Sequence, residues 1–200
     1  MPGVPGNGLH RSRGPQSCST QRSPPRDLRL NTFRTACAAA ILAVATAWSS
    51  APAIAASTVV PFASELAPGT ILVRTEERAL YLVMEDGLAR RYVVGVGAMG
   101  WQWAGTTSID GKFIEPNWMP PPEIRREQPG LPLVIAGGSP ANPMGAAAMT
   151  LAGGNYAIHG TNVPGSIGGF VSHGCIRMLN EDVMDLFGRV GIGTAVVVVP

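Results

Sequence analysis

The chain has 200 residues, of which 46% are hydrophobic and 14% charged, with 25 glycines and 18 prolines. This composition excludes fibrous, fully disordered and multi-spanning membrane proteins, and it favours one compact domain with appended segments. Residues 1–55 carry six arginines against Asp27, a net charge of +5, whereas residues 56–200 carry nine Lys and Arg against twelve Asp and Glu, a net charge of −3. The positive charge therefore lies outside the segment that can fold, which argues against a nucleic-acid-binding protein.

The first 56 residues have the pattern of an export signal with a long polar n-region. Residues 1–30 are rich in Arg, Pro, Gly and Ser, residues 36–48 are an apolar run, and residues 53–56 (Ala-Ile-Ala-Ala) resemble a cleavage site. The apolar run is about half the ~20 residues needed to span a bilayer, so we expect cleavage near Ala55 or Ala56 and no stable transmembrane span. Because no adjacent arginine pair precedes the run, the general secretory route is expected.

Removal of this signal leaves a single cysteine. Cys18 and Cys37 lie within the signal, so Cys175 is the only thiol of the expected mature chain, and an internal disulfide is not possible there. A lone buried cysteine is often a small apolar side chain. The neighbours of Cys175 favour a reactive thiol instead.

After a linker expected over residues 57–69, a single domain is expected over residues 70–200. Three runs of β-branched or alternating residues predict an antiparallel meander, and they cover residues 70–75, 79–85 and 88–96. The turn at Asp86-Gly87 is suited to a type I′ hairpin.

Residues 97–142 are rich in Gly, Pro and Trp and have no helical period. We expect long loops here, around short strands near residues 113–114 and 133–136. Loops of this length in a compact domain usually carry function.

A helix is predicted after Asn180, which is a suitable N-cap residue. Glu181 and Asp182 suit the positive end of this helix. Its expected apolar face consists of Val183, Leu186, Phe187 and Val190. The continuous apolar run over residues 194–199 predicts a central strand.

The residues with the most distinctive chemistry lie between residues 156 and 180, where His159, His173 and Cys175 occur together. A thiol is a strong nucleophile only when deprotonated, and a nearby imidazole or helix N-terminus lowers its pKa. The glycine-rich loop can bring His159 next to Cys175, so we expect a lowered thiol pKa. Gly174 allows the backbone to turn its amides toward a developing oxyanion.

This window resembles the active-site motif of the L,D-transpeptidase catalytic domain family, in the branch typical of Gram-negative cell envelopes. The resemblance rests on His159-Gly160 followed by Ser172-His173-Gly174-Cys175, with further similarity in residues 117–121 and 142–145. It implies a mainly β, mixed β-sandwich-like L,D-transpeptidase catalytic fold with one short helix after the cysteine. The gap between His159 and Ser172 is shorter than in some branches of the family.

The resemblance also implies roles for individual residues. Cys175 corresponds to the nucleophile and His159 to the general base, which the Gly160 carbonyl orients, while His173 shapes the site. The backbone amides of residues 173–175 would form the oxyanion hole. The resemblance implies no cofactor and no metal.

Several of these residues have structural alternatives. His173 either transfers a proton or only holds the loop, and the Ser172 hydroxyl is expected to stabilise a turn rather than to act as a nucleophile. Arg177 stands where some branches have Asn, and it either binds a substrate carboxylate or pairs with Asp182. Trp118 is a candidate wall of a substrate cleft, although loop tryptophans more often serve packing.

The reaction implied by the resemblance is acyl transfer on peptidoglycan tetrapeptide stems that contain diaminopimelate, in the periplasm. Cys175 would attack the carbonyl before the terminal D-Ala, and a diaminopimelate amine would resolve the thioester into a 3→3 cross-link. Water, a free D-amino acid or the C-terminal lysine of an outer-membrane lipoprotein are alternative acceptors. Carbapenems would acylate the same thiol.

Two other classes of function stay open. One is a different Cys-His enzyme, although the Thr-x-Thr-Cys pattern of sortases and a papain-like cysteine far upstream of its histidine are both missing from the sequence. The other is a non-catalytic cell-wall-binding protein or a metal site. His159, His173 and Cys175 lack the fourth ligand that a structural zinc site needs.

Overall fold

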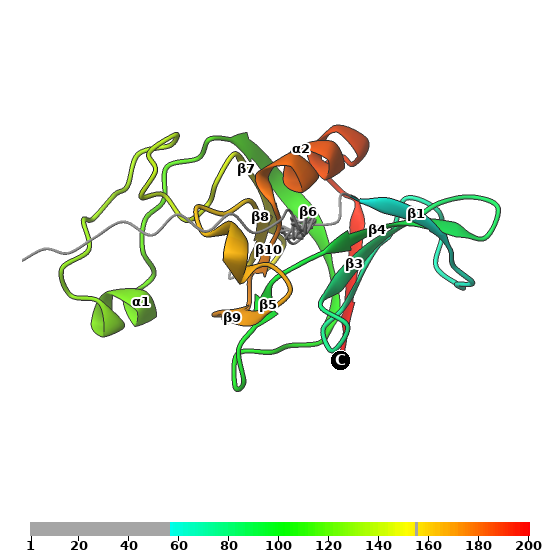
Figure 1. Ribbon diagram of the computed structural model, residues 1–200, viewed down its shortest axis with the longest axis horizontal. Helices are drawn as coiled ribbons and strands as arrows, with labels where there is room; N and C mark the ends of the chain where they lie inside the picture. Colours follow the sequence, from blue (N-terminus) through cyan, green and yellow to red (C-terminus); the bar gives the residue numbers. More distant parts are fainter. Residues whose placement is uncertain (1–56, 155) are drawn as a thin grey trace, which may run out of the picture. The chain divides into compact units, whose positions relative to one another are not determined.

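A computed structural model describes residues 57–154 and 156–200 (Figure 1). The expected export signal and its cleavage-site residues up to Ala56 lie outside the described residues. Within the described ranges, no helix is long and apolar enough to cross a membrane.

Nine strands form one mixed sheet, in the order β1-β4-β3-β2-β11-β6-β7-β8-β10. The strands are β1 (Thr58–Pro61), β2 (Ile71–Arg74), β3 (Ala79–Val83), β4 (Leu88–Val93), β6 (Gly105–Ile114), β7 (Ala147–Leu151), β8 (Ala157–His159), β10 (Ile176–Arg177) and β11 (Ala195–Val199). β11 is parallel to β2, and β10 is parallel to β8, whereas the other pairs are antiparallel. A separate parallel pair joins β5 (Val96–Gly97) to β9 (Phe170–Ser172).

The predicted meander is present as β2, β3 and β4. Its second turn has φ values of 58° at Asp86 and 69° at Gly87, and positive φ at both central residues is the property of a type I′ turn. The predicted C-terminal strand is also central, because β11 lies between β2 and β6.

The structure differs from the sequence prediction before the meander. The segment expected as a linker contains β1, which pairs with β4 through Thr58 opposite Arg91. The residues Thr58-Val59-Val60 are β-branched, and such side chains favour a strand once a partner edge is available.

The structure also differs within the segment expected as long loops. β6 is ten residues long and contains a register shift between Ile109 and Gly111. A short helix, α1 (Pro122–Glu127), starts with Pro at its first position, where the missing amide is tolerated. The second expected short strand is only an isolated bridge between Trp118 and Ile135.

The helix expected after the cysteine is α2 (Asn180–Arg189), and Glu181 and Asp182 lie in its first turn as predicted. The N-cap position is Leu179, which makes no side-chain cap hydrogen bond, so the prediction of Asn180 as N-cap is wrong. A one-turn 3₁₀ helix, η1 (Pro164–Ser166), lies in the loop between β8 and β9.

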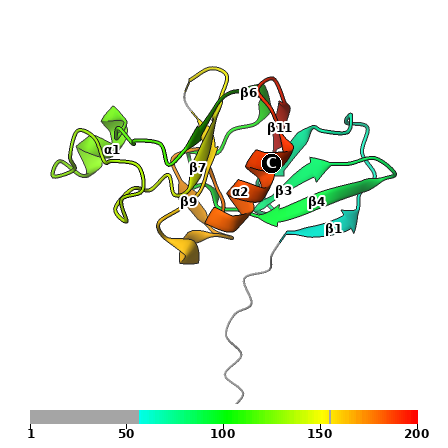
Figure 2. The same cartoon turned by 90° about the horizontal axis from the view of Figure 1, so that it is seen from above.

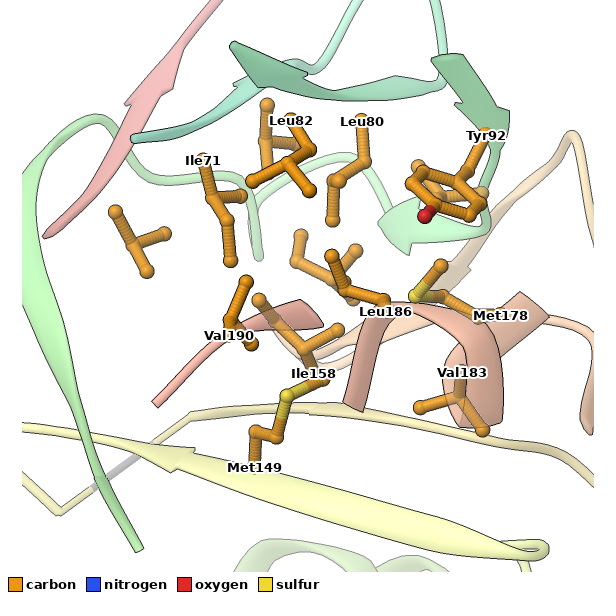
Figure 3. Packing of buried hydrophobic residues seen from close by; sticks show 14 of the residues in the cluster. Ile71, Leu80, Leu82, Tyr92, Met149, Ile158, Met178, Val183, Leu186 and Val190 are labelled. Atoms are coloured by element: carbon orange, nitrogen blue, oxygen red, sulfur yellow. The ribbon is translucent and has the colours of Figure 1, made fainter. Parts of the chain in front are cut away.

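The main core lies between the sheet and α2, and Figure 3 shows side chains of both converging there. Ile71 and Leu80 come from the meander, Ile158 from β8 and Leu186 from α2, and all four are fully buried. Full burial of such a side chain contributes about 1.5–3 kcal/mol to the stability of the folded domain. Figures 1 and 2 both show α1 away from this core, at the end of the domain opposite to β1.

Candidate active site

Strand pairing places the histidine and cysteine segments side by side. His159 is the last residue of β8, and Cys175 immediately precedes β10, which runs parallel to β8 with Arg177 opposite His159. Both residues line a cleft of about 730 Å³. Other lining residues are Trp101, Trp118, Pro121, Tyr156, Ser172, His173 and Arg177.

His159 is buried and oriented by its own backbone. Its Nδ1 atom lies 2.7 Å from the carbonyl oxygen of Gly160. Since a carbonyl can only accept, Nδ1 carries the proton and the lone pair is on Nε2. Burial, with a smaller effect from the Arg177 charge, lowers the pKa of His159 to about 4, although the carbonyls of Gly160 and Pro143 oppose this. The imidazole is therefore neutral at pH 7.

The prediction of a lowered thiol pKa at Cys175 is wrong. Burial raises the pKa of the Cys175 thiol, and the Ala157 backbone amide and the Arg177 charge oppose this only in part. The two causes expected to lower the thiol pKa are missing. The His159 imidazole carries no charge. β10 separates Cys175 from the positive end of α2, and the effect of a helix end falls off within one turn. The resting pair is a neutral thiol with a neutral imidazole.

The Ser172 hydroxyl holds the loop that contains Cys175. Ser172 Oγ donates to the Cys175 carbonyl oxygen at 2.6 Å and accepts from the Gly174 amide at 3.1 Å. Because the Gly174 amide is engaged, it is not available as an oxyanion donor as the sequence had suggested. The His173 and Cys175 amides donate to no acceptor in the part of the chain that the structure describes.

Gly174 is required at its position by a close approach to Tyr156. Its φ is +107°, and a Cβ atom there would meet the Tyr156 ring. Trp103 stacks on the same ring with centroids 4.9 Å apart, and its Nε1 donates to the Gly174 carbonyl at 2.8 Å. The two aromatic rings thus fix the loop beside the cysteine.

His173 is held by a residue that the sequence reasoning missed. Its Nε2 lies 3.0 Å and 3.1 Å from the two carboxylate oxygens of Glu127, the last residue of α1. Trp101 contacts the His173 ring edge-on, with centroids 4.6 Å apart. Glu127 is 46 residues away in a segment expected as loop, so no local signal indicated it.

Arg177 does not pair with Asp182, which was the alternative role expected for it. No ion pair involves Arg177 within residues 57–154 and 156–200, and its Nε atom is buried there without a hydrogen-bond partner. Burial lowers the pKa of its guanidinium. Arg177 and Trp118 both line the cleft.

Asn180 connects three segments around the site. Its Oδ1 accepts hydrogen bonds from the amides of Ala146 at 3.1 Å and Thr161 at 3.0 Å. These amides precede β7 and follow His159, so the side chain expected to cap α2 instead fixes the strand end that contains His159. Among the described residues, no cluster of three or more His, Cys, Asp or Glu is placed to hold a metal ion.

Comparisons with known proteins agree with this arrangement. Residues 68–198 match the YkuD family model, described as the L,D-transpeptidase catalytic domain. The Escherichia coli K12 protein named "Probable L,D-transpeptidase ErfK/SrfK" is 36% identical over 139 residues, which are 66% of this chain and 44% of that protein. "Probable L,D-transpeptidase YbiS" from the same organism is 37% identical over 136 residues, 64% of this chain and 43% of that protein. The chain thus spans less than half the length of these relatives.

The fold comparison gives the same result. A crystal structure of a mutant Enterococcus faecium L,D-transpeptidase aligns with a TM-score of 0.53 at 18% identity, over 67% of this chain and 50% of that one. The predicted mainly β fold with a helix after the cysteine is therefore confirmed. Because the family model matches more than half of its residues, the chain belongs to the L,D-transpeptidase catalytic domain family.

Proposed function

We propose that this chain is a cysteine-dependent L,D-transpeptidase that acts on peptidoglycan stem peptides. The observation that carries the proposal is the state of His159: Nδ1 donates to the Gly160 carbonyl, so the lone pair of the neutral ring is on Nε2. The Cys175 thiol lines the same cleft. An oriented base beside a thiol is the combination that nucleophilic acyl transfer needs.

The first half-reaction forms a thioester. The Cys175 sulfur attacks the carbonyl before the terminal D-Ala of a tetrapeptide stem while its proton passes to His159 Nε2. The amides of His173 and Cys175 stabilise the oxyanion, because they have no other acceptor among the described residues. The imidazolium then donates its proton to the departing amine, and D-Ala leaves.

The second half-reaction transfers the acyl group to an amine. A diaminopimelate side-chain amine of a second stem attacks the thioester and gives its proton to His159. Collapse of the tetrahedral intermediate forms the amide of a 3→3 cross-link, and the departing sulfur regains a proton from the imidazolium. Water, a free D-amino acid or a lipoprotein lysine would enter at the same step.

Arg177 and Trp118 are proposed to contact the substrate. Arg177 is half-buried and has no anionic partner among the described residues, and such a cation is unfavourable unless a ligand supplies the partner. Stem peptides carry carboxylates, and the planar guanidinium binds a carboxylate through two parallel hydrogen bonds. Arg177 is therefore proposed to hold a stem carboxylate, with Trp118 as an apolar wall.

The place of action follows from the substrate. Peptidoglycan lies outside the inner membrane, so an enzyme that acts on it has to be exported, as the signal-like residues 1–56 suggest. We propose that the mature domain acts in the periplasm.

Mass spectrometry of purified muropeptides incubated with residues 57–200 tests the proposal. Release of D-Ala with a new 3→3 dimer is expected. Release of D-Ala with a shortened stem identifies a carboxypeptidase, and incorporation of an added D-amino acid identifies an exchange enzyme. Muropeptides that are bound but unchanged would contradict the proposal and favour a wall-binding protein.

A further inference from the structure

Asp182 is a buried carboxylate that forms no ion pair with residues 57–154 or 156–200. It lies in the first turn of α2 with 3% of its surface exposed. Its Oδ2 atom has no hydrogen-bond partner among the described residues, and no ion pair there includes it. A buried carboxylate is unfavourable unless a positive charge or several donors accompany it.

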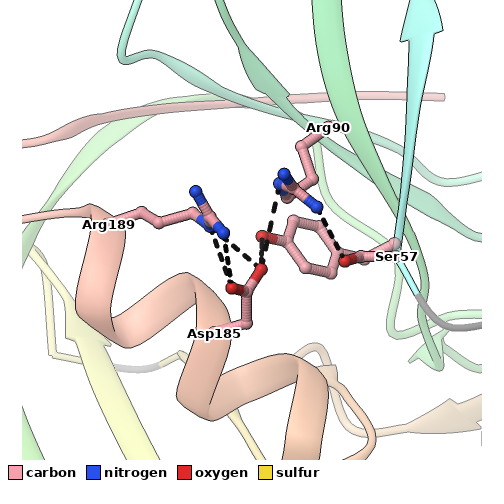
Figure 4. A network of polar contacts seen from close by, with 5 residues as sticks. Ser57, Arg90, Asp185 and Arg189 are labelled. Carbon is pink, nitrogen blue, oxygen red and sulfur yellow. Dashed lines mark hydrogen bonds and ion pairs between the residues drawn. The ribbon is translucent and has the colours of Figure 1, made fainter.

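The backbone amide of Ser57 donates a hydrogen bond to the Asp182 carboxylate. Two further contacts fix Ser57 in place. Arg90 Nη1 donates to Ser57 Oγ at 3.2 Å (Figure 4), and the pairing of β1 with β4 begins at the next residue, Thr58. Ser57 is therefore fixed beside β4 by contacts that do not involve Asp182.

Ser57 directly follows the small residues of the expected cleavage site. Hydrolysis of the Ala56–Ser57 peptide bond by a processing endopeptidase consumes one water molecule. It leaves a carboxylate on Ala56 and a primary ammonium group on Ser57. Before cleavage the Ser57 nitrogen is a neutral amide with one N–H donor. After cleavage it is an ammonium group with three N–H donors at pH 7, because the ordinary pKa of an α-amino group is about 7.7–8.0.

We infer that Asp182 is the binding site for the processed N-terminus: cleavage between Ala56 and Ser57 places the new ammonium group on the orphaned Asp182 carboxylate and forms a buried ion pair. The inference does not depend on the proposed catalytic function. The ion pair would make the exported domain more stable than its precursor. The Asp182 carboxylate is buried in both forms, but a positive charge accompanies it only in the cleaved form.

The charges around Asp182 agree with a cationic partner. Burial raises the pKa of Asp182, and the neighbouring carboxylates of Glu181 and Asp185 on α2 raise it further, while the Ser57 amide opposes them. From β4, Arg90 approaches Asp185, with 3.9 Å between Nε and Oδ2 (Figure 4). The acidic side chains of α2 thus outnumber the cations that approach them, and an ammonium group at Ser57 would add the missing positive charge.

Unfolding temperatures of the exported protein test the ion pair. Sequencing of its N-terminus is expected to begin at Ser57. The same protein is then acetylated at its α-amine while unfolded near pH 6.5, where the only lysine, Lys112, is protonated, and refolded. Acetylation keeps the Ser57 N–H but removes the charge, so we expect it to lower Tm by about 5 °C, a shift typical of a lost interaction of this kind.

Two variants identify the partner of the ammonium group. In Asp182→Asn, acetylation is expected to change Tm by less than about 1 °C, whereas Glu181→Gln, an exposed neighbour on the same helix, should retain the full difference. The difference should also disappear as the pH rises above the amine pKa, since pairing raises that pKa and its stabilisation is lost once the amine is neutral.

A measurement on the wild type alone remains decisive if Asp182→Asn does not fold. The native α-amine should react with acetic anhydride at least tenfold more slowly than the α-amine of the unfolded chain. A start other than Ser57, an unprotected α-amine, or equal Tm values for the free and acetylated proteins would overturn the inference.

Discussion

Asn180 Oδ1 accepts the backbone amide of Thr161 at 3.0 Å, two residues after the proposed base His159. The same oxygen accepts the Ala146 amide at 3.1 Å. The first residue of α2 therefore fixes the chain on both sides of the β7–β8 pair that ends at His159. The position of the proposed base depends on a side chain 21 residues away in the sequence.

Removal of this acceptor should destabilise the domain. Asn180→Ala leaves two part-buried amides without this partner, and each such loss costs about 1–3 kcal/mol. We expect the free energy of unfolding, measured by urea denaturation, to fall by about 2–4 kcal/mol. The matched control is Asn162→Ala, which removes only an exposed hydrogen bond to the Pro140 carbonyl. Equal losses in the two variants would contradict this account of Asn180.

The parts of the fold that were predictable are those that local sequence determines. Asp86-Gly87 sets its own turn type, and the apolar run of β11 indicates a central strand. β6 was mostly missed because most of its residues are polar or small, and its length depends on pairing with β7 and β11. α1 has no buried residue, so it lacks the apolar period by which a helix is detected.

The candidate site likewise has features that local sequence determines and features that depend on the folded chain. The motif located Cys175 and His159 because their spacing is readable along the chain. Burial is a property of the folded chain, so the direction of the thiol pKa shift was predicted wrongly. Asn180 was interpreted as a cap because its local pattern fits one, yet amides from other segments compete for its oxygen.

Acid should destabilise the domain through His159. Below pH 6.5 the unfolded chain binds a proton at this residue that the folded chain, with a His159 pKa of about 4, does not bind. Stability is therefore lost as the pH falls from 6.5 toward 4, by up to about 3 kcal/mol. The His159→Gln variant lacks this titration, so its free energy of unfolding should change less over the same range. Identical pH profiles would contradict the assignment of a neutral, buried His159.

The two histidines should differ in how alkaline pH affects their variants. His159→Ala removes the base, so the rate should fall by roughly 10²-fold and recover in part once the pH approaches the raised thiol pKa. His173→Ala removes the contact with Glu127 and disturbs the loop of Gly174, so alkaline pH should not restore its rate. Iodoacetamide alkylation measured against pH reports the thiol pKa in each variant. Alkaline recovery in His173→Ala alone would reverse the two roles.

Arg177 should be important for substrate binding but not for folding. Arg177→Gln removes a half-buried cation without an anionic partner in the described part of the chain, so the unfolding temperature should not fall. Loss of a charge-assisted hydrogen bond of about 1.5–3 kcal/mol should raise KM for a stem peptide by roughly 10–100-fold. Arg177→Lys keeps the charge but not the planar pair of donors, and it should give an intermediate KM. An unchanged KM in Arg177→Gln would exclude the proposed carboxylate contact.

Intact-protein mass spectrometry after mixing with a tetrapeptide stem tests the central claim, acylation of Cys175, most directly. The wild type should gain the mass of the stem less D-Ala, and a carbapenem should likewise add one adduct. Cys175→Ala should gain neither while its circular dichroism and Tm stay close to those of the wild type, because the thiol contributes little packing. An adduct on Cys175→Ala, or D-Ala release by that variant, would contradict the assignment of Cys175 as the nucleophile.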